Sequence, residues 1–133
     1  MAKKLLKLKK YIFVLFFLAS FTTFAQKKYP NNYFRSPLDI PLKISGTFGE
    51  LRNNHFHAGI DIKTNHRTGL KVYATADGYV SRIKVALWGY GKTIYITHPN
   101  GYTSVYAHLS KFGDGIQEYV KNIQYQKESY ETG

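Results

Sequence analysis

Cysteine is absent from this sequence of 133 residues, so no disulfide bond can hold the fold together. A chain of this length is enough for one domain and no more, and its stability must come from a hydrophobic core, a bound metal or neighbouring chain. Acidic residues are also few, 8 against 19 lysines and arginines, which gives a formal net charge of +11. The 12 tyrosines and 9 phenylalanines favour a β-rich fold.

Long hydrophobic runs are scarce. The apolar stretch at residues 11–21 is too short to span a bilayer comfortably, and it follows a segment with five lysines. Thr23 and Ala25 are small residues at the two positions that a signal peptidase inspects. We therefore expect a signal peptide over residues 1–25, cleaved after Ala25, and export to the periplasm or cell envelope. An uncleaved N-terminal anchor is the alternative. Contact with the membrane is expected only through the signal peptide before cleavage.

Cleavage after Ala25 would remove five lysines and no acids, so the formal charge would fall from +11 to +6. A basic surface of this size favours anionic envelope polymers, although it also describes an ordinary solvated surface. Nucleic acid is not an expected partner of a protein with a signal peptide.

The rest of the chain divides into a linker and one domain. Residues 26–41 hold three of the four prolines and show no sustained periodicity, which predicts a linker. Residues 42–133 form the predicted domain. Short alternating segments joined by Gly, Asn and Asp turns predict five or six antiparallel strands. These segments are residues 42–48, the stretch around His57, and residues 70–74, 79–85, 92–98 and 102–108.

Apolar residues after Leu109 recur at helical spacing. This spacing predicts an amphipathic helix over residues 115–130, with Asp114 as its N-cap. The predicted fold class is therefore mainly β, an antiparallel sheet domain with one C-terminal amphipathic helix.

His57 and Asp61 are candidate metal ligands. Residues four apart in an extended strand project from the same face, so these two side chains can converge on one ion. The small residues Ala58 and Gly59 leave room beside the backbone, and Ile60 on the opposite face would anchor the strand in a core. The alternative is a surface strand whose histidines are merely solvated.

His108 is a second candidate, at the end of a predicted strand with Tyr106 beside it. Because imidazole exchanges protons near neutral pH, His108 could act as a general base or donate to a developing oxyanion. A histidine satisfied in the core or at the surface is the alternative. We expect His66 to be exposed in a polar turn, and His98, which shares a face with Ile94, to serve in packing.

Several motifs follow one another in a specific order, from about Gly46 to Leu109. They are Gly49-Glu50-Leu51-Arg52, Phe56-His57-Ala58-Gly59-Ile60-Asp61, Ala76-Asp77-Gly78-Tyr79-Val80, Gly89-Tyr90-Gly91, His98-Pro99-Asn100-Gly101-Tyr102 and Tyr106-Ala107-His108-Leu109. In this order they resemble the lysostaphin-type (LytM-like) zinc endopeptidases, which cut peptide cross-links of bacterial peptidoglycan.

The resemblance implies that His57 and Asp61 bind Zn2+ and that His108 is one of two catalytic histidines. It also implies a duplicated hybrid motif-like sheet that lines a groove for an extended peptidoglycan peptide. In the family a later His-x-His strand supplies the third zinc ligand and the other catalytic histidine. This chain has histidines only at 55, 57, 66, 98 and 108. His55 shares the face of His57, but neighbouring residues on one face of a strand rarely enclose an ion.

We therefore expect the front part of such a peptidase domain, with weak metal binding and little or no turnover, so that this chain alone is inactive. A non-catalytic envelope module that binds peptide or regulates an amidase is the alternative. A biotinyl- or lipoyl-carrier hairpin is a weaker possibility, because the Asp77-Gly78 turn has no lysine to carry such a group. The oligomeric state is left open.

Overall fold

The computed structural model describes Lys9, Tyr11 and residues 31–133. The predicted signal peptide lies outside the described residues except for Lys9 and Tyr11. The chain forms two units, Met1–Asn31 and Asn32–Gly133. Within the described part, no helix combines the length and the apolar character that crossing a membrane requires.

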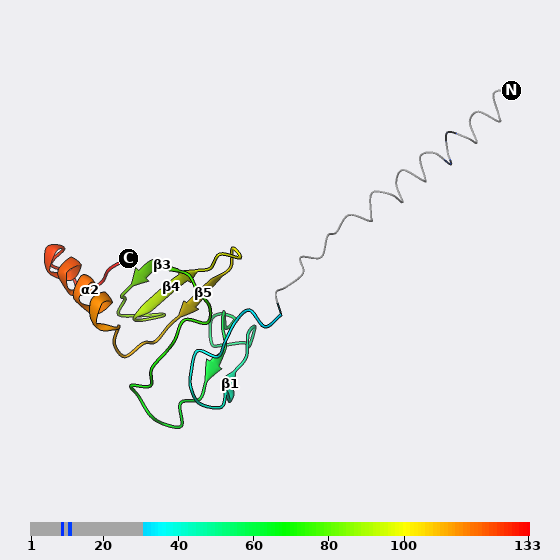
Figure 1. The fold of residues 1–133 in the computed structure, drawn as a ribbon, viewed down its shortest axis with the longest axis horizontal. Coiled ribbons are helices and arrows are strands. Elements are labelled where there is room, and N and C mark those ends of the chain that lie inside the picture. Colours follow the sequence, from blue (N-terminus) through cyan, green and yellow to red (C-terminus); the bar gives the residue numbers. More distant parts are fainter. Residues whose placement is uncertain (1–8, 10, 12–30) are drawn as a thin grey trace. The chain divides into compact units, whose positions relative to one another are not determined.

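Two antiparallel sheets and one helix make up the unit Asn32–Gly133 (Figure 1). In the first sheet β1 (Ile44–Gly46) pairs with β2 (Asp61–Ile62). In the second, β3 (Tyr79–Lys84), β4 (Thr93–Thr97) and β5 (Thr103–Tyr106) pair in the order β3-β4-β5. The helix α2 (Asp114–Gln126) follows. The predicted fold class, mainly antiparallel β with one C-terminal helix, is confirmed.

The predicted strand at residues 70–74 does not form. This segment instead lies against residues 35–37, where the Arg35 N–H donates to Thr75 O at 2.7 Å and the Tyr73 N–H donates to Pro37 O at 2.9 Å. The end of the predicted linker thus packs on the domain, and the compact unit begins at Asn32 rather than Leu42. Alternation of apolar and polar residues indicates that one face of a segment is buried, but it does not indicate which other segment will lie beside it.

The stretch around His57 is not the long strand that its alternation predicts. Only Asp61 and Ile62 are in β2, because residues 49–57 fold back on themselves as a hairpin. Ile60 is 52% exposed, so the prediction that it anchors a core is wrong.

The hydrophobic core lies between the three-stranded sheet and α2. Val85, Phe112 and Val120 are buried, and Ile83, Ile94, Leu109 and Ile116 pack around them. Thr132 pairs with Val85 through backbone hydrogen bonds of 2.9 and 3.0 Å, which brings the C-terminal segment beside the continuation of β3.

The ends of α2 differ from the prediction. Gly113 is the N-cap without a side-chain hydrogen bond, and Asp114 lies in the first turn. A carboxylate in the first turn is favourable, because the N-terminal end of a helix carries partial positive charge. The helix ends at Gln126 instead of Tyr130.

Candidate metal centre

A tight hairpin places His57. The Gly49 N–H donates to His57 O and the His57 N–H donates to Glu50 O, both at 2.8 Å, and Arg52 N–H donates to His55 O at 2.9 Å across the turn. Gly49 has φ +76°, in the left-handed region that favours glycine. The hairpin returns His57 to the neighbourhood of Thr47, whose carbonyl oxygen lies 3.0 Å from His57 Nδ1.

Asp61 is placed by the pairing of β1 with β2, in which it lies opposite Gly46. A Cβ atom added at Gly46 would collide with the Asp61 carboxylate and would lie 2.6 Å from Arg52 Nη2. The missing side chain is therefore what lets the Arg52 guanidinium reach Asp61. Arg52 Nη2 donates to Asp61 Oδ2 at 2.7 Å and lies 3.4 Å from Glu50 Oε2.

The two predicted metal ligands face each other. His57 Nε2 lies 3.3 Å from Asp61 Oδ1. Two ligand atoms bound to one tetrahedral zinc ion lie about 3.3 to 3.5 Å apart, given zinc–ligand distances of about 2.0 to 2.2 Å. The separation of the two side chains therefore suits a shared zinc ion.

The protonation of His57 follows from its other contacts. Nδ1 lies 3.0 Å from the Thr47 carbonyl oxygen, which can only accept, and 3.3 Å from Arg52 Nη2, which can only donate. The shorter contact and the commitment of Arg52 Nη2 to Asp61 assign the proton to Nδ1. A metal ion between Nε2 and the carboxylate would require an unprotonated Nε2, and it would then satisfy the lone pairs of both groups.

The charge of Asp61 is stabilised by its neighbours. The hydrogen bond from Arg52 lowers the pKa of Asp61 below its ordinary value, partial burial opposes this, and the charges of His57 and His108 add to the lowering. The same hydrogen bond raises the pKa of Arg52. Asp61 is thus kept ionised, as a metal ligand must be.

His108 lies beyond the end of β5, so it does not continue the strand face of Tyr106 as the sequence predicts. It has φ +55°, its N–H donates to Tyr90 O at 3.0 Å, and its ring meets the Tyr90 ring edge-on at 6.4 Å. Its imidazole is exposed and near enough to affect the pKa of Asp61. The left-handed residue therefore leaves His108 at the cleft that the two predicted ligands also line.

These three side chains line one open cleft of about 1400 Å³. Apolar and hydroxyl side chains supply much of the remaining wall, including Tyr90, Tyr95, Thr103, Val105 and Tyr106. The structure thus brings His57, Asp61 and His108 to one cavity.

The other histidines have different surroundings. His55 is exposed and its Nδ1 lies 2.7 Å from Asn54 Oδ1, and His66 is exposed as predicted. His98 is 2% exposed, with Nδ1 2.8 Å from Asp77 O and Nε2 2.9 Å from Ser104 Oγ, which confirms its packing role. Among the described residues, no group of three or more His, Cys, Asp or Glu side chains could hold a metal.

Arg52 and Gly46 are site residues that sequence reasoning missed. The sequence places Arg52 in the Gly49-Glu50-Leu51-Arg52 motif but assigns it no role, and it predicts Gly46 only as part of a strand. An arginine nine residues before a predicted carboxylate ligand is too weak a signal to pair them, because their contact depends on the hairpin between them.

The cleft brings together histidines and a carboxylate, which are side chains that bind zinc in metal-dependent hydrolases. The model of peptidase family M23 matches residues 55–125 of this chain. The chain therefore belongs to peptidase family M23, and its fold is that of a LytM-type domain of this family.

Curated relatives agree with this membership. The chain is 39% identical over 75 residues to the DD-carboxypeptidase/endopeptidase Mpg of Neisseria meningitidis serogroup B, a match that covers 53% of the chain and 17% of the relative. A protein of the same name from Neisseria gonorrhoeae gives the same values. An "Uncharacterized metalloprotease" of Haemophilus influenzae is 31% identical over 83 residues, covering 58% of the chain and 17% of the relative. The comparison with solved structures found no match.

Proposed function

We propose that this chain carries the His57–Asp61 half of the zinc centre of an exported metalloendopeptidase that cleaves peptide cross-links of peptidoglycan. The observation that carries the proposal is the 3.3 Å separation of His57 Nε2 and Asp61 Oδ1 in a cleft that also contains His108. Membership in a peptidase family and the names of the Neisseria relatives support hydrolysis of peptide bonds.

Each side chain has a task that its contacts suit. His57 and Asp61 would hold Zn2+. Thr47 O orients the His57 ring through Nδ1, and Arg52 orients Asp61 through Oδ2. Zinc held there would supply Lewis-acid chemistry that polarises a peptide carbonyl. His108, exposed at the cleft, moves a proton or donates to the oxygen that gains charge.

The cleft also suits an extended peptide. β5 is at an edge of the described three-stranded sheet, and its residues Thr103 and Val105 line the cleft. An edge strand offers backbone donors and acceptors with which an extended chain can pair. A peptide along β5 would end near His108, which follows this strand.

A non-catalytic module of the same fold, which binds envelope peptide or regulates an amidase, is the second candidate. It is favoured by the two-residue ligand set, since no third protein ligand accompanies His57 and Asp61 among the described residues. A catalytic zinc commonly has three protein ligands.

Zinc titration tests the ligand assignment. We expect the chain to bind one Zn2+ weakly, His57→Ala and Asp61→Ala to abolish this binding, and His108→Ala to retain it. Competition with a chromophoric chelator measures the affinity, and circular dichroism checks that each variant is folded. Loss of zinc from His108→Ala, or its retention by the other two variants, would show that the division of roles is wrong.

A second experiment separates the peptidase from the binding module. The chain is extended with a family-type His-x-His strand and incubated with purified peptidoglycan. Release of peptide ends that requires zinc and His108 supports the peptidase. Binding of peptidoglycan without release, by a protein with full zinc content, supports the module.

A further inference from the structure

We propose that the turn at residues 64–67 binds a free carboxylate group of the peptide in the cleft, through the Arg67 guanidinium and the Thr64 hydroxyl. This inference rests on the proposed function, because it assumes that the occupant of the cleft is a peptide. It assigns a binding role to a segment that the zinc centre does not use.

The backbone of this turn brings the two side chains together. Asn65 and His66 have φ of +53° and +57°, and the Arg67 N–H donates to Thr64 O at 3.1 Å. Two left-handed central residues closed by such a bond are the features of a type I′ turn, which asparagine favours. The first and fourth residues of a β-turn lie close together, so this turn places Thr64 beside Arg67.

Both side chains belong to the cleft that contains the candidate metal centre. Thr64, Arg67 and the neighbouring Thr68 line it together with His57 and Asp61. Thr64 is partly buried and Arg67 is exposed, so the arginine is accessible to a molecule that enters the cleft.

The charges in the cleft leave Arg67 without an anion. Arg52 and Arg67 are the permanent cations among its described lining residues, and Asp61 is the acidic one. Arg52 forms ion pairs with Asp61 at 2.7 Å and with Glu50 at 3.4 Å. Within residues 31–133, no carboxylate lies at ion-pair distance from Arg67.

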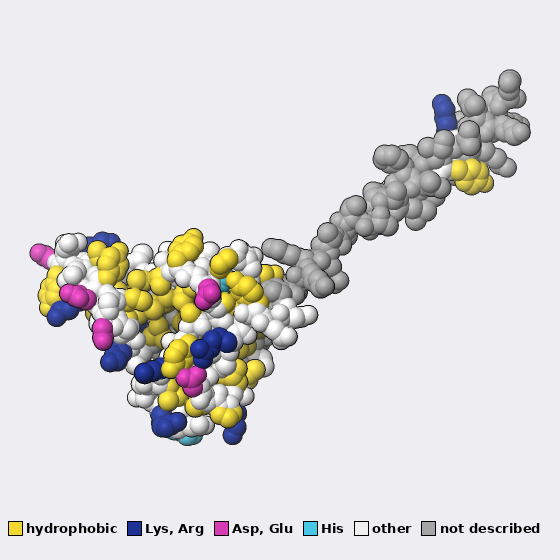
Figure 2. Space-filling model, viewed as in Figure 1, with side chains coloured by type: hydrophobic (Ala, Val, Ile, Leu, Met, Phe, Trp, Pro, Cys, Tyr) yellow, Lys and Arg dark blue, Asp and Glu magenta, His cyan; other side chains and the backbone are white. Residues whose placement is uncertain are grey.

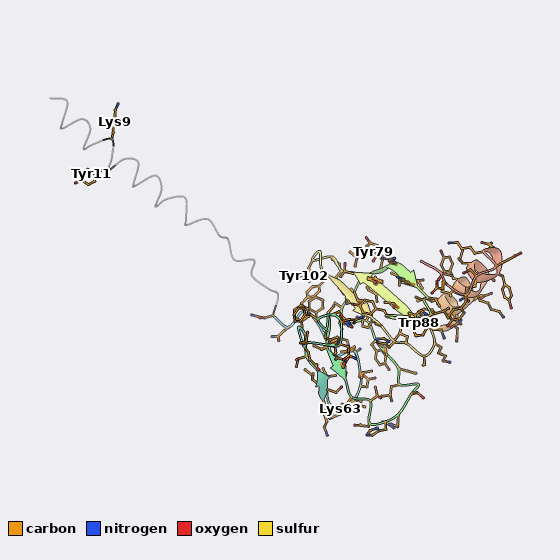
Figure 3. The ribbon with its side chains drawn as sticks, turned by 180° about the vertical axis from the view of Figure 1, so that it is seen from behind. Lys9, Tyr11, Lys63, Tyr79, Trp88 and Tyr102 are labelled. Atoms are coloured by element: carbon orange, nitrogen blue, oxygen red, sulfur yellow. The ribbon has the colours of Figure 1, made fainter. Side chains whose placement is uncertain are left out.

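The surroundings of the turn strengthen the positive field. Residues 62–76 contain no Asp or Glu, while Lys63, Lys71 and His66 lie in this stretch. Lys63, next to the turn, lies at the end of the domain opposite Tyr79 and Tyr102 (Figure 3). In the space-filling view the tip of the same end shows basic and histidine side chains, with an acidic side chain above them (Figure 2). An anionic group is therefore attracted to this side of the cleft.

A carboxylate is the anion that fits a peptide-filled cleft. A guanidinium binds a carboxylate with parallel N–H donors, and a hydroxyl beside it can donate to a remaining lone pair. A peptide brings such a group as its C-terminus or as an acidic side chain. The turn would thus select peptides that keep a free carboxylate at this position.

Binding of two forms of one peptide to the full, zinc-free chain tests this inference. A peptidoglycan stem peptide is prepared with its carboxyl groups free and with the same groups converted to carboxamides, and calorimetry measures both affinities at low and high salt. We expect the free form to bind about 5- to 10-fold more tightly at low salt, with a smaller difference at high salt.

Variants with matched charge loss identify the residues. Arg67→Gln should abolish the preference for the free form without weakening the amidated one, and Thr64→Val should reduce it about threefold. Lys71→Gln removes one positive charge from the same loop outside the cleft lining and should keep the preference. Thermal unfolding confirms that the variants are folded.

The outcomes separate this inference from the proposed function. Equal binding of both peptide forms, or equal losses in Arg67→Gln and Lys71→Gln, would overturn the carboxylate site and leave a peptide-binding cleft. Failure of both forms to bind would contradict the cleft as a peptide site, and the carboxylate site with it.

Discussion

Three residues from successive segments of the chain set the geometry of the candidate metal centre. Gly46 lies in β1, Arg52 in the hairpin and Asp61 in β2, and the arginine reaches the carboxylate over the bare backbone of the glycine. Arg52 holds Oδ2, which leaves Oδ1 directed at His57. A carboxylate whose other oxygen is already held by a hydrogen bond loses less conformational entropy when a metal binds.

Gly46→Ala should damage this arrangement. The new Cβ would collide with the Asp61 carboxylate and press on Arg52 Nη2, so that one of them must move. We expect zinc affinity to fall about 10- to 100-fold, as for the loss of groups that orient a metal ligand. Chelator competition measures this affinity. Gly113→Ala is the control, since nothing lies within 4 Å of its added Cβ. An unchanged affinity in Gly46→Ala would show that Gly46 does not help to position the metal ligands.

At the scale of elements, two contacts hold the domain together: the helix α2 packs on the core, and residues 35–39 pack against residues 73–75. α2 contributes Val120 and Ile116 to the cluster around Phe112. Residues 35–39 attach to residues 73–75 through two backbone hydrogen bonds and through the Arg35 guanidinium, which lies 4.7 Å from the centre of the Tyr73 ring. The Arg35–Asp39 ion pair at 2.9 Å lies within the first segment.

Phe112→Ala should destabilise the domain strongly. Its side chain is 2% exposed among Val85, Val120 and their neighbours, so truncation leaves a cavity and costs about 3 to 5 kcal/mol. Urea unfolding monitored by circular dichroism measures this change. Tyr119→Ala on α2 is the control, because Tyr119 is 58% exposed and its loss should cost less than about 1 kcal/mol. Similar losses in both variants would contradict the assigned core.

The contact of Tyr73 with Asp39 should appear in its titration. A hydrogen bond to Asp39 raises the pKa of Tyr73 above its ordinary value, so the folded state favours the neutral phenol. This contribution to stability is complete below the pKa of Tyr73 in the unfolded chain and is lost as the pH rises through the raised folded-state value.

Asp39→Asn should return the Tyr73 pKa toward its ordinary value. Carbon-13 labelled tyrosine followed by NMR over alkaline pH measures it, with Tyr73→Phe assigning the signal. Glu118→Gln, on α2, should leave the Tyr73 titration unchanged. An unshifted Tyr73 in the Asp39→Asn variant would show that the two segments are not joined by this contact.

At the scale of the whole molecule, large apolar side chains remain exposed on the described domain. They include Phe48, Leu51, Phe56, Leu87 and Trp88, at 66 to 86% exposure. The hairpin of residues 49–57 contains Leu51 and Phe56, and Phe48 directly precedes it. Leu87 and Trp88 come shortly before Tyr90, which lines the cleft. Large apolar side chains are therefore exposed in the segments beside the candidate centre.

Export should remove the first 25 residues. Expression in a bacterial host with a cell envelope should yield a mature protein that begins at Gln26, because Thr23 and Ala25 fit the signal peptidase. Mass spectrometry of the envelope fraction identifies this end. Ala25→Trp should block the cut, whereas Ala19→Trp should not, and a wild-type protein that keeps Met1 in the membrane fraction would support the uncleaved anchor.

Much of the fold and part of the site could be predicted because their signals are local. Alternation identified β3, β4 and β5, the Pro99-Asn100-Gly101 segment identified the turn between β4 and β5, and helical spacing identified α2. The order of short motifs identified the family. The ligand pair His57 and Asp61 could be proposed from spacing, although its assumed strand was largely replaced by a hairpin.

The sequence by itself determined the residue types that any site can use: which side chains carry charge, which can hold a metal and which must be buried. The tertiary structure alone decided which of them meet. Arg52 reaches Asp61 across a hairpin, His108 leaves β5 through a left-handed residue, and residues 70–74 pair with residues 35–37 instead of forming a strand. The physical reason is that periodicity and turn preferences act over a few neighbouring residues. These contacts depend instead on the path of the whole chain and on which polar groups still need a hydrogen-bond partner once the chain has folded.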